Sequence, residues 1–119
     1  MPKLIFFDTE TCGLYGPIVL LQYARDWGSV TLHEVWRSSI DTTLAVIEEI
    51  VNEEDGVVGF NIAFDWFHLV QSYSTLLLLK EEVGGGELPI DHIELYAICE
   101  EKARRTCPAI KPVKCLDLM

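Results

Sequence analysis

The stretch that most constrains the fold is residues 4–14, LIFFDTETCGL, an apolar run typical of a buried strand that nevertheless carries two acids. Successive side chains of a strand point to opposite faces, so Asp8 and Glu10 share one face and Thr9 lies on the other. Two carboxylates on one face repel each other unless something neutralises them. Because Mg²⁺ and Mn²⁺ prefer oxygen ligands, the pair predicts a divalent-cation site. The alternative is an edge strand with solvated acids.

Length and composition indicate one small domain over residues 1–119. No apolar run reaches about 18 residues, the length of a membrane-spanning helix. The N-terminus also lacks the basic and apolar regions of a cleavable signal. We therefore expect a soluble, cytoplasmic protein with no membrane partner. The four cysteines show no CxxC spacing, which favours reduced thiols over disulfides or a zinc site.

The net charge of −10 argues against tight binding of nucleic acid by this chain alone. Binding to phosphates usually depends on clustered Lys and Arg, and the nine basic residues here are scattered. Bound divalent ions would offset only part of the negative charge. Affinity for a long polyanion must therefore be weak or come from another domain.

Hydrophobic periodicity predicts an α/β chain that begins with a three-stranded antiparallel meander over residues 3–10, 16–27 and 29–39. The period then changes to that of an amphipathic helix over 41–56, with Asp41 as N-cap and Gly56 beyond the last turn. Strand and helix therefore alternate from this point on.

A short buried strand is expected at 56–61, followed by a helix over 62–80 with Asn61 as its cap. Asp65 then falls in the first turn, where unpaired amides and the helix dipole favour a carboxylate. The remaining segments are predicted as a loop at 81–89, a strand running into a helix at 90–105, and a tail over 107–119 that ends as though a helix were beginning.

The segments FFDTETCGL and GFNIAFDWFHL resemble the first two motifs of the DEDD superfamily of 3′-to-5′ exonucleases. The chain is similar in particular to the proofreading domains of family A DNA polymerases, especially phage ones, over residues 4 to about 118. The resemblance implies a ribonuclease H-like α/β fold, with a three-stranded antiparallel meander followed by helix, strand and helix. It also implies release of nucleoside 5′-monophosphates from DNA 3′ ends, in a bacterial or phage-infected cell. A polar residue at Gln22 matches the ribonuclease D group and leaves an RNA 3′ end as an alternative substrate.

The same resemblance assigns the catalytic, metal-binding roles to Asp8, Glu10 and Asp65. In the superfamily such ligands hold two Mg²⁺ or Mn²⁺ ions, one activating water and the other stabilising the leaving 3′ oxygen. Substrate contacts are implied for Thr9, Thr11, Leu14, Asn61 and Phe64. Alternative interpretations remain for three of them: Leu14 and Phe64 as core residues, and Asn61 as a helix cap alone.

The superfamily also needs a fourth carboxylate, an Asp preceded four or five residues earlier by Tyr or His. Tyr96 with Glu100 has the spacing but not the Asp, and Asp117 has no Tyr or His at that offset. We therefore expect an exonuclease domain that is incomplete at its C-terminus and is completed by a polymerase domain or a second chain. A second hypothesis is a non-catalytic module that binds nucleic acid or a polymerase-like partner. The apolar surface left uncovered predicts self-association.

Overall fold

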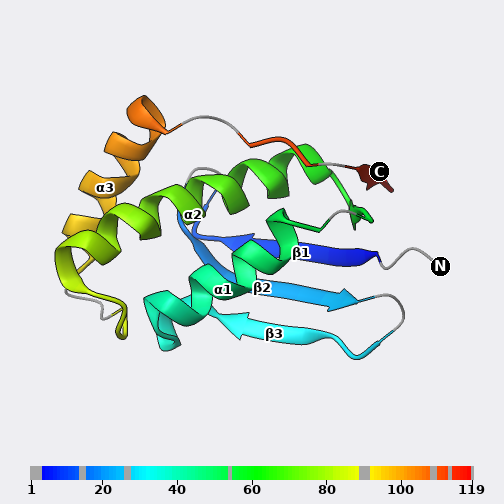
Figure 1. Cartoon of the computed structure of the whole chain (residues 1–119), viewed down its shortest axis with the longest axis horizontal. Helices are drawn as coiled ribbons and strands as arrows, with labels where there is room; N and C mark the ends of the chain where they lie inside the picture. The colour runs from blue at the N-terminus through cyan, green and yellow to red at the C-terminus, as the bar shows by residue number, and fades with distance from the viewer. Residues whose placement is uncertain are drawn as a thin grey trace.

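A computed structural model describes residues 4–13, 16–25, 28–53, 55–88, 92–107, 110–112 and 114–118. In these ranges the chain forms one five-stranded mixed sheet with helices packed against it (Figure 1). The strands are β1 (Ile5–Thr11), β2 (Ile18–Arg25), β3 (Thr31–Glu34), β4 (Val57–Gly59) and β5 (Cys115–Asp117). The helices are α1 (Ile40–Val51), α2 (Ile62–Val83) and α3 (Ile93–Thr106), with a 3-10 turn, η1, at Val35–Arg37.

The strand order across the sheet is β3-β2-β1-β4-β5. β1 pairs antiparallel with β2, and β2 with β3, so the expected meander is confirmed. β4 then pairs parallel with the other side of β1, and β5 parallel with β4. The α/β class and the succession of meander, helix, strand and helix are therefore as predicted from the sequence.

The two faces of the sheet differ in what covers them. Burial alternates along β1: the side chains of Ile5, Phe7 and Thr9 are buried. The acids that alternate with them, Asp8 and Glu10, are exposed. Figure 1 shows α1 and α2 on the same side of the sheet, and their buried residues share one core with Ile5 and Phe7. The alternation predicted for β1 is therefore confirmed. We call the side that bears Asp8 and Glu10 the open face.

Helix α1 begins differently from the prediction. Its N-cap is Ser39, whose hydroxyl accepts a hydrogen bond from the Thr42 amide at 3.0 Å, so Asp41 is not the cap but lies inside the first turn. Asp41 instead pairs with Lys80 of α2. The helix ends at Val51, earlier than the predicted span, and its Leu44, Ile47 and Ile50 are buried as expected.

Other element boundaries also move. The third strand covers only residues 31–34 and is followed by η1, while α2 continues to Val83. Within 92–105 the chain is helical without the predicted strand, and residues 90 and 91 lie outside the described ranges. None of the described helices is long and apolar enough to cross a membrane.

The tail forms a strand, β5, and the expectation of a new helix there was wrong. The edge of β4 that faces away from β1 explains the difference, because the backbone amides and carbonyls along it need hydrogen-bond partners. The Val57 amide donates to the Lys114 carbonyl at 3.0 Å, and the Leu118 amide donates to the Gly59 carbonyl at 2.8 Å. Pairing with β4 therefore outweighs the local tendency of the tail.

We predict that burial of His33 makes the fold sensitive to mild acid. His33 of β3 is buried, and its Nε2 lies 2.7 Å from the Thr43 hydroxyl of α1. Burial lowers the pKa of His33 from its usual 6.5. The neutral imidazole of His33 therefore contributes fully to the unfolding free energy above about pH 6.5. This contribution is lost as the pH falls through the lowered folded-state pKa.

Urea unfolding at several pH values tests this prediction. His33→Gln keeps a hydrogen-bonding group near Thr43 but does not titrate, so the loss of unfolding free energy below pH ~6.5 should be smaller in the variant than in the parent. Equal pH dependence in the two proteins would contradict it.

Candidate functional site

The predicted acids come from the middle of β1 and the first turn of α2. Asp8 and Glu10 are exposed on the open face, whereas Asp65 is only 4% exposed. Asp8 lies opposite Gln22 of β2, and Glu10 lies opposite Leu20 at the point where the register shifts. The position of Asp65 in the first turn of α2 is confirmed.

Thr9 connects β1 to Asp65. The Thr9 hydroxyl donates to Asp65 Oδ1 at 2.6 Å, a contact between buried side chains 56 residues apart in sequence. Burial raises the pKa of Asp65, and the charge of Asp8 raises it further. The side-chain and backbone hydrogen bonds from Thr9, and the charge of His68, lower the pKa of Asp65 without cancelling the rise. Asp65 is thus a desolvated carboxyl with a raised pKa.

The donor chemistry suits Mg²⁺ or Mn²⁺, since all three predicted ligands are carboxylates. The negative charge of Asp8 adds to the effect of burial in raising the pKa of Asp65. Over the described residues, however, no three His, Cys, Asp or Glu side chains are grouped as metal ligands. Asp65 is hydrogen-bonded to Thr9 on the buried face of β1, whereas Asp8 and Glu10 lie on the open face, so these described residues do not form one group of three ligands.

The predicted substrate contacts are distributed around this site. The Thr11 hydroxyl donates to the Gly13 carbonyl at 2.5 Å at the end of β1. Phe64, half-buried in the first turn of α2, meets the His68 ring edge-on, with ring centroids 4.5 Å apart. Leu14 lies outside the described residues.

Asn61 occupies the N-cap position of α2, as predicted, but does not cap the helix with its side chain. Its backbone is in the left-handed region, with φ 52°. The amides of Asn61 and Ile62 donate instead to the carboxylate of Asp117, at 2.9 and 3.3 Å. Sequence reasoning missed this role of Asp117, because a contact 55 residues away has no local signal in the sequence.

A shallow cavity of about 230 Å³ lies on the open face next to Asp8. Its walls include Phe6, Gln22, Val30, Phe60 and Leu118. Phe60 is 67% exposed and Val30 63%, so large apolar side chains border an acid here. Of the predicted ligands, Asp8 lines this cavity.

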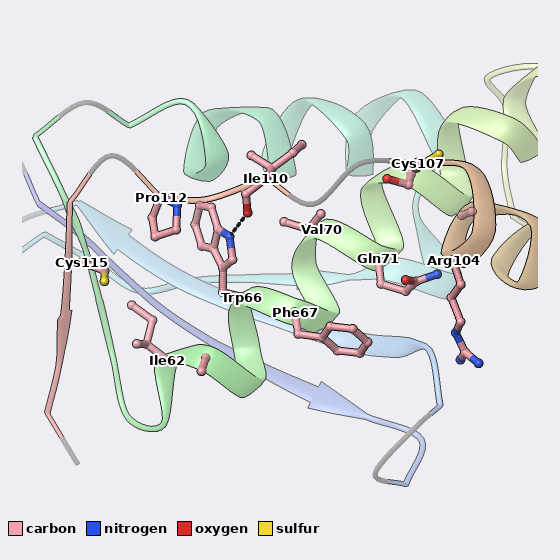
Figure 2. A pocket seen from close by; sticks show the side chains of 13 residues that line it. Ile62, Trp66, Phe67, Val70, Gln71, Arg104, Cys107, Ile110, Pro112 and Cys115 are labelled. Carbon is pink, nitrogen blue, oxygen red and sulfur yellow. Dashed lines mark hydrogen bonds between the residues drawn. The ribbon is translucent and has the colours of Figure 1, made fainter.

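A second cavity, of about 630 Å³, lies elsewhere (Figure 2). Residues of α2 and α3 line it together with Ile110, Pro112 and Cys115, and none of the predicted acids is among the lining residues. Trp66 on its wall donates from Nε1 to the Ile110 carbonyl at 2.7 Å, and packs edge-on against Phe7. Trp66 is therefore part of the core.

Tyr96 and Glu100 serve the packing of α3 on α2. Tyr96 is buried and hydrogen-bonded to Ser72 of α2, and burial raises the pKa of its hydroxyl. The Glu100 carbonyl accepts from the Gln71 side chain at 3.1 Å, and its carboxylate pairs with Arg104. These contacts account for the pair without a catalytic role.

No family model, curated protein or solved structure matches the chain. The resemblance to the DEDD exonucleases therefore stays a prediction, based on the two motifs. The functional argument depends on the side chains themselves.

We predict that Asp65 is destabilising in its ionised form. When folding raises the pKa of an acid, the unfolding free energy of the protein falls as the pH rises from the usual pKa, here 3.8, through the raised folded-state pKa. Asp65→Asn, which keeps an oxygen for the Thr9 hydroxyl, should therefore increase the unfolding free energy at neutral pH. Urea unfolding measures the change, and a lower value for the variant would refute the prediction.

The Thr9 hydrogen bond should depend on the charge of its acceptor. Thr9→Val should cost about 1.5–3 kcal/mol in the parent, the range for bonds to charged groups. In the Asp65→Asn background the same substitution should cost only about 0.5–1.5 kcal/mol. Equal costs in the two backgrounds, measured by urea unfolding, would show that the Asp65 charge is unimportant to this contact.

Proposed function

We propose that this chain is a metal-dependent 3′-to-5′ exonuclease domain of the ribonuclease H-like type, which releases nucleoside 5′-monophosphates from DNA 3′ ends. The observation that carries the proposal is the buried carboxyl of Asp65, held by Thr9 of the strand that also carries Asp8 and Glu10. A desolvated carboxyl is costly for the fold, and such groups cluster at functional sites.

The sheet supports the proposal through its topology. β1 and β4 are adjacent and parallel, and α2 follows the carboxyl end of β4. Ligands of α/β sheets bind at the carboxyl ends of parallel strands, which is where Asp65 meets β1. The observed succession of meander, helix, strand and helix is also the one that the resemblance implies.

Each residue has a role in the proposed site. Asp8, Glu10 and Asp65 would hold Mg²⁺ or Mn²⁺, and Thr9 fixes the carboxyl of Asp65. A bound cation would lower the pKa of an attacking water and stabilise the leaving oxygen. The exposed side chains of Asp8 and Glu10 can change rotamer to approach a cation.

The substrate would approach from the side of Asp8. Phe64 and Asn61 lie at the start of α2 near Asp65 in sequence, and Thr11 ends β1 directly after Glu10. With a net charge of −10, the site would bind DNA weakly unless a polymerase domain or second chain holds the strand. The proposal assigns the fourth carboxylate to that same partner.

Cation binding is the first test of the proposal. At a cation concentration about ten times Kd, a specific site stabilises the fold by about 1.4 kcal/mol. We expect Mg²⁺ or Mn²⁺ to raise the melting temperature of the parent and to have a smaller effect on Asp8→Asn. Glu81→Gln changes the charge equally on an exposed residue near the far end of α2 and should behave like the parent.

An exonuclease assay gives the second readout. A 5′-labelled single strand of DNA, incubated with protein and Mn²⁺, should shorten slowly from its 3′ end, and chelation should stop the reaction. An RNA strand in a parallel reaction distinguishes the alternative substrate. The proposal fails if the cation stabilises the parent, Asp8→Asn and Glu81→Gln equally and no strand is shortened.

The open face favours a second candidate function, a non-catalytic nucleic-acid-binding module. Leu32 and Leu116, which face the same side as Asp8 and Phe6, are 62% and 55% exposed, and Phe60 borders the cavity there. Exposed apolar and aromatic groups of this kind mark interaction surfaces. Phe60 could stack on a base of a single strand.

The two functions differ in their need for a cation. A binding module should hold a fluorescent oligonucleotide equally well with and without chelator, and Phe60→Ala should weaken the complex by about 1–3 kcal/mol. Phe67→Ala removes an equally large exposed ring on α2, outside the open face, and should leave the affinity unchanged. If anisotropy shows binding only with Mg²⁺, or equal losses in both variants, the module hypothesis is wrong.

A further inference from the structure

We infer that Asp117 is a positioning residue for the candidate site, because its carboxylate fixes the start of α2 and thereby the place of Asp65. The inference concerns the geometry of Asp65. Only the consequence of this geometry for catalysis rests on the proposed function.

The first observation is the way α2 is capped. A helix begins with unpaired amides, which a side chain of the preceding residue usually satisfies. Asn61 at that position makes no such side-chain bond and has a left-handed backbone. The two oxygens of Asp117 replace it, because Oδ1 accepts from the Asn61 amide and Oδ2 from the Ile62 amide. The negative charge of Asp117 also interacts favourably with the positive N-terminal end of the helix dipole.

The second observation is that Asp117 is itself held by the sheet. It lies opposite Gly59 in the parallel pairing of β5 with β4, and the next amide, that of Leu118, donates to the Gly59 carbonyl at 2.8 Å. Gly59 is packed tightly, since a Cβ there would lie 3.2 Å from the Phe7 carbonyl oxygen. The carboxylate therefore projects toward α2 from a fixed backbone.

A third contact attaches the segment before β5 to the same helix. Trp66 follows Asp65 directly on α2, and its Nε1 donates a hydrogen bond to the Ile110 carbonyl, as Figure 2 shows. Trp66 is buried and also packs against Phe7 of β1. The first turns of α2 are thus held from both Ile110 and Asp117.

These contacts form a continuous path to the candidate ligand. Asp117 binds the amides of Asn61 and Ile62, and the Asn61 carbonyl accepts from the Asp65 amide at 3.4 Å. The carboxyl of Asp65 then accepts from the Thr9 hydroxyl. Loosening the cap would let the first turn fray and would expose Asp65 to water.

Two substitutions of Asp117 separate position from charge. Asp117→Ala and Asp117→Asn remove the same charge, but Asn keeps an oxygen that can accept from the helix amides and is a good capping residue. We expect faster hydrogen exchange at the Asn61 and Ile62 amides in the Ala variant than in the Asn variant. The Asp65 amide, which donates to the Asn61 carbonyl at 3.4 Å, should also exchange faster in the Ala variant.

If the parent protein binds Mn²⁺, the affinity of each variant for Mn²⁺ is the functional readout. Asp117→Ala should weaken it by about tenfold or more, as losses of groups that support metal ligands do, and Asp117→Asn should weaken it less. Glu81→Gln is the matched control for charge. If the Ala chain does not fold, Asp117→Ser takes its place in the same comparisons.

The outcomes distinguish this inference from the proposed function. Equal exchange at the Asn61, Ile62 and Asp65 amides in the Ala and Asn variants would overturn the positioning role. A clear difference between these variants, in a protein that binds no cation, would support the positioning role and count against the exonuclease proposal.

Discussion

The hydrogen bond from Thr9 to Asp65 is the contact on which the candidate site depends. It joins the central strand to the first turn of α2, and it does so through a carboxyl that is almost fully removed from water. Burying this acid costs free energy, because desolvation disfavours its charged form and raises its pKa. The core on the covered face supplies the opposing stabilisation, with Ile5 and Leu69 among its fully buried members.

Local patterns in the sequence were sufficient for most of the architecture. The alternation of β1 assigned Asp8 and Thr9 to opposite faces, and the periodicity of α2 placed Asp65 in its first turn. Boundaries were less accurate wherever two local signals compete, as at the start of α1, where Ser39 and Asp41 are both good caps and only Ser39 has the extended backbone of one.

Long-range pairing explains what the sequence did not reveal. β5 is a strand because the edge of β4 is available, and nothing in CLDLM itself specifies that partner. The same limit applies to the site. Sequence spacing could suggest that Asp65 approaches β1, but it gave no indication that Thr9, on the face opposite Asp8, is its hydrogen-bond donor. Asp117 was likewise considered only as a ligand, whereas its oxygens face helix amides.

The distance in sequence between α2 and its cap also bears on the order of folding. During synthesis, the first turn of α2 leaves the ribosome 55 residues before Asp117 does. Contacts between such distant residues form late, because closing a long loop costs entropy before the contact is gained. The meander and α1 can assemble from nearby residues, while the start of α2 waits for the tail. A nascent chain of this protein would thus carry a frayed helix end beside its most conspicuous acids.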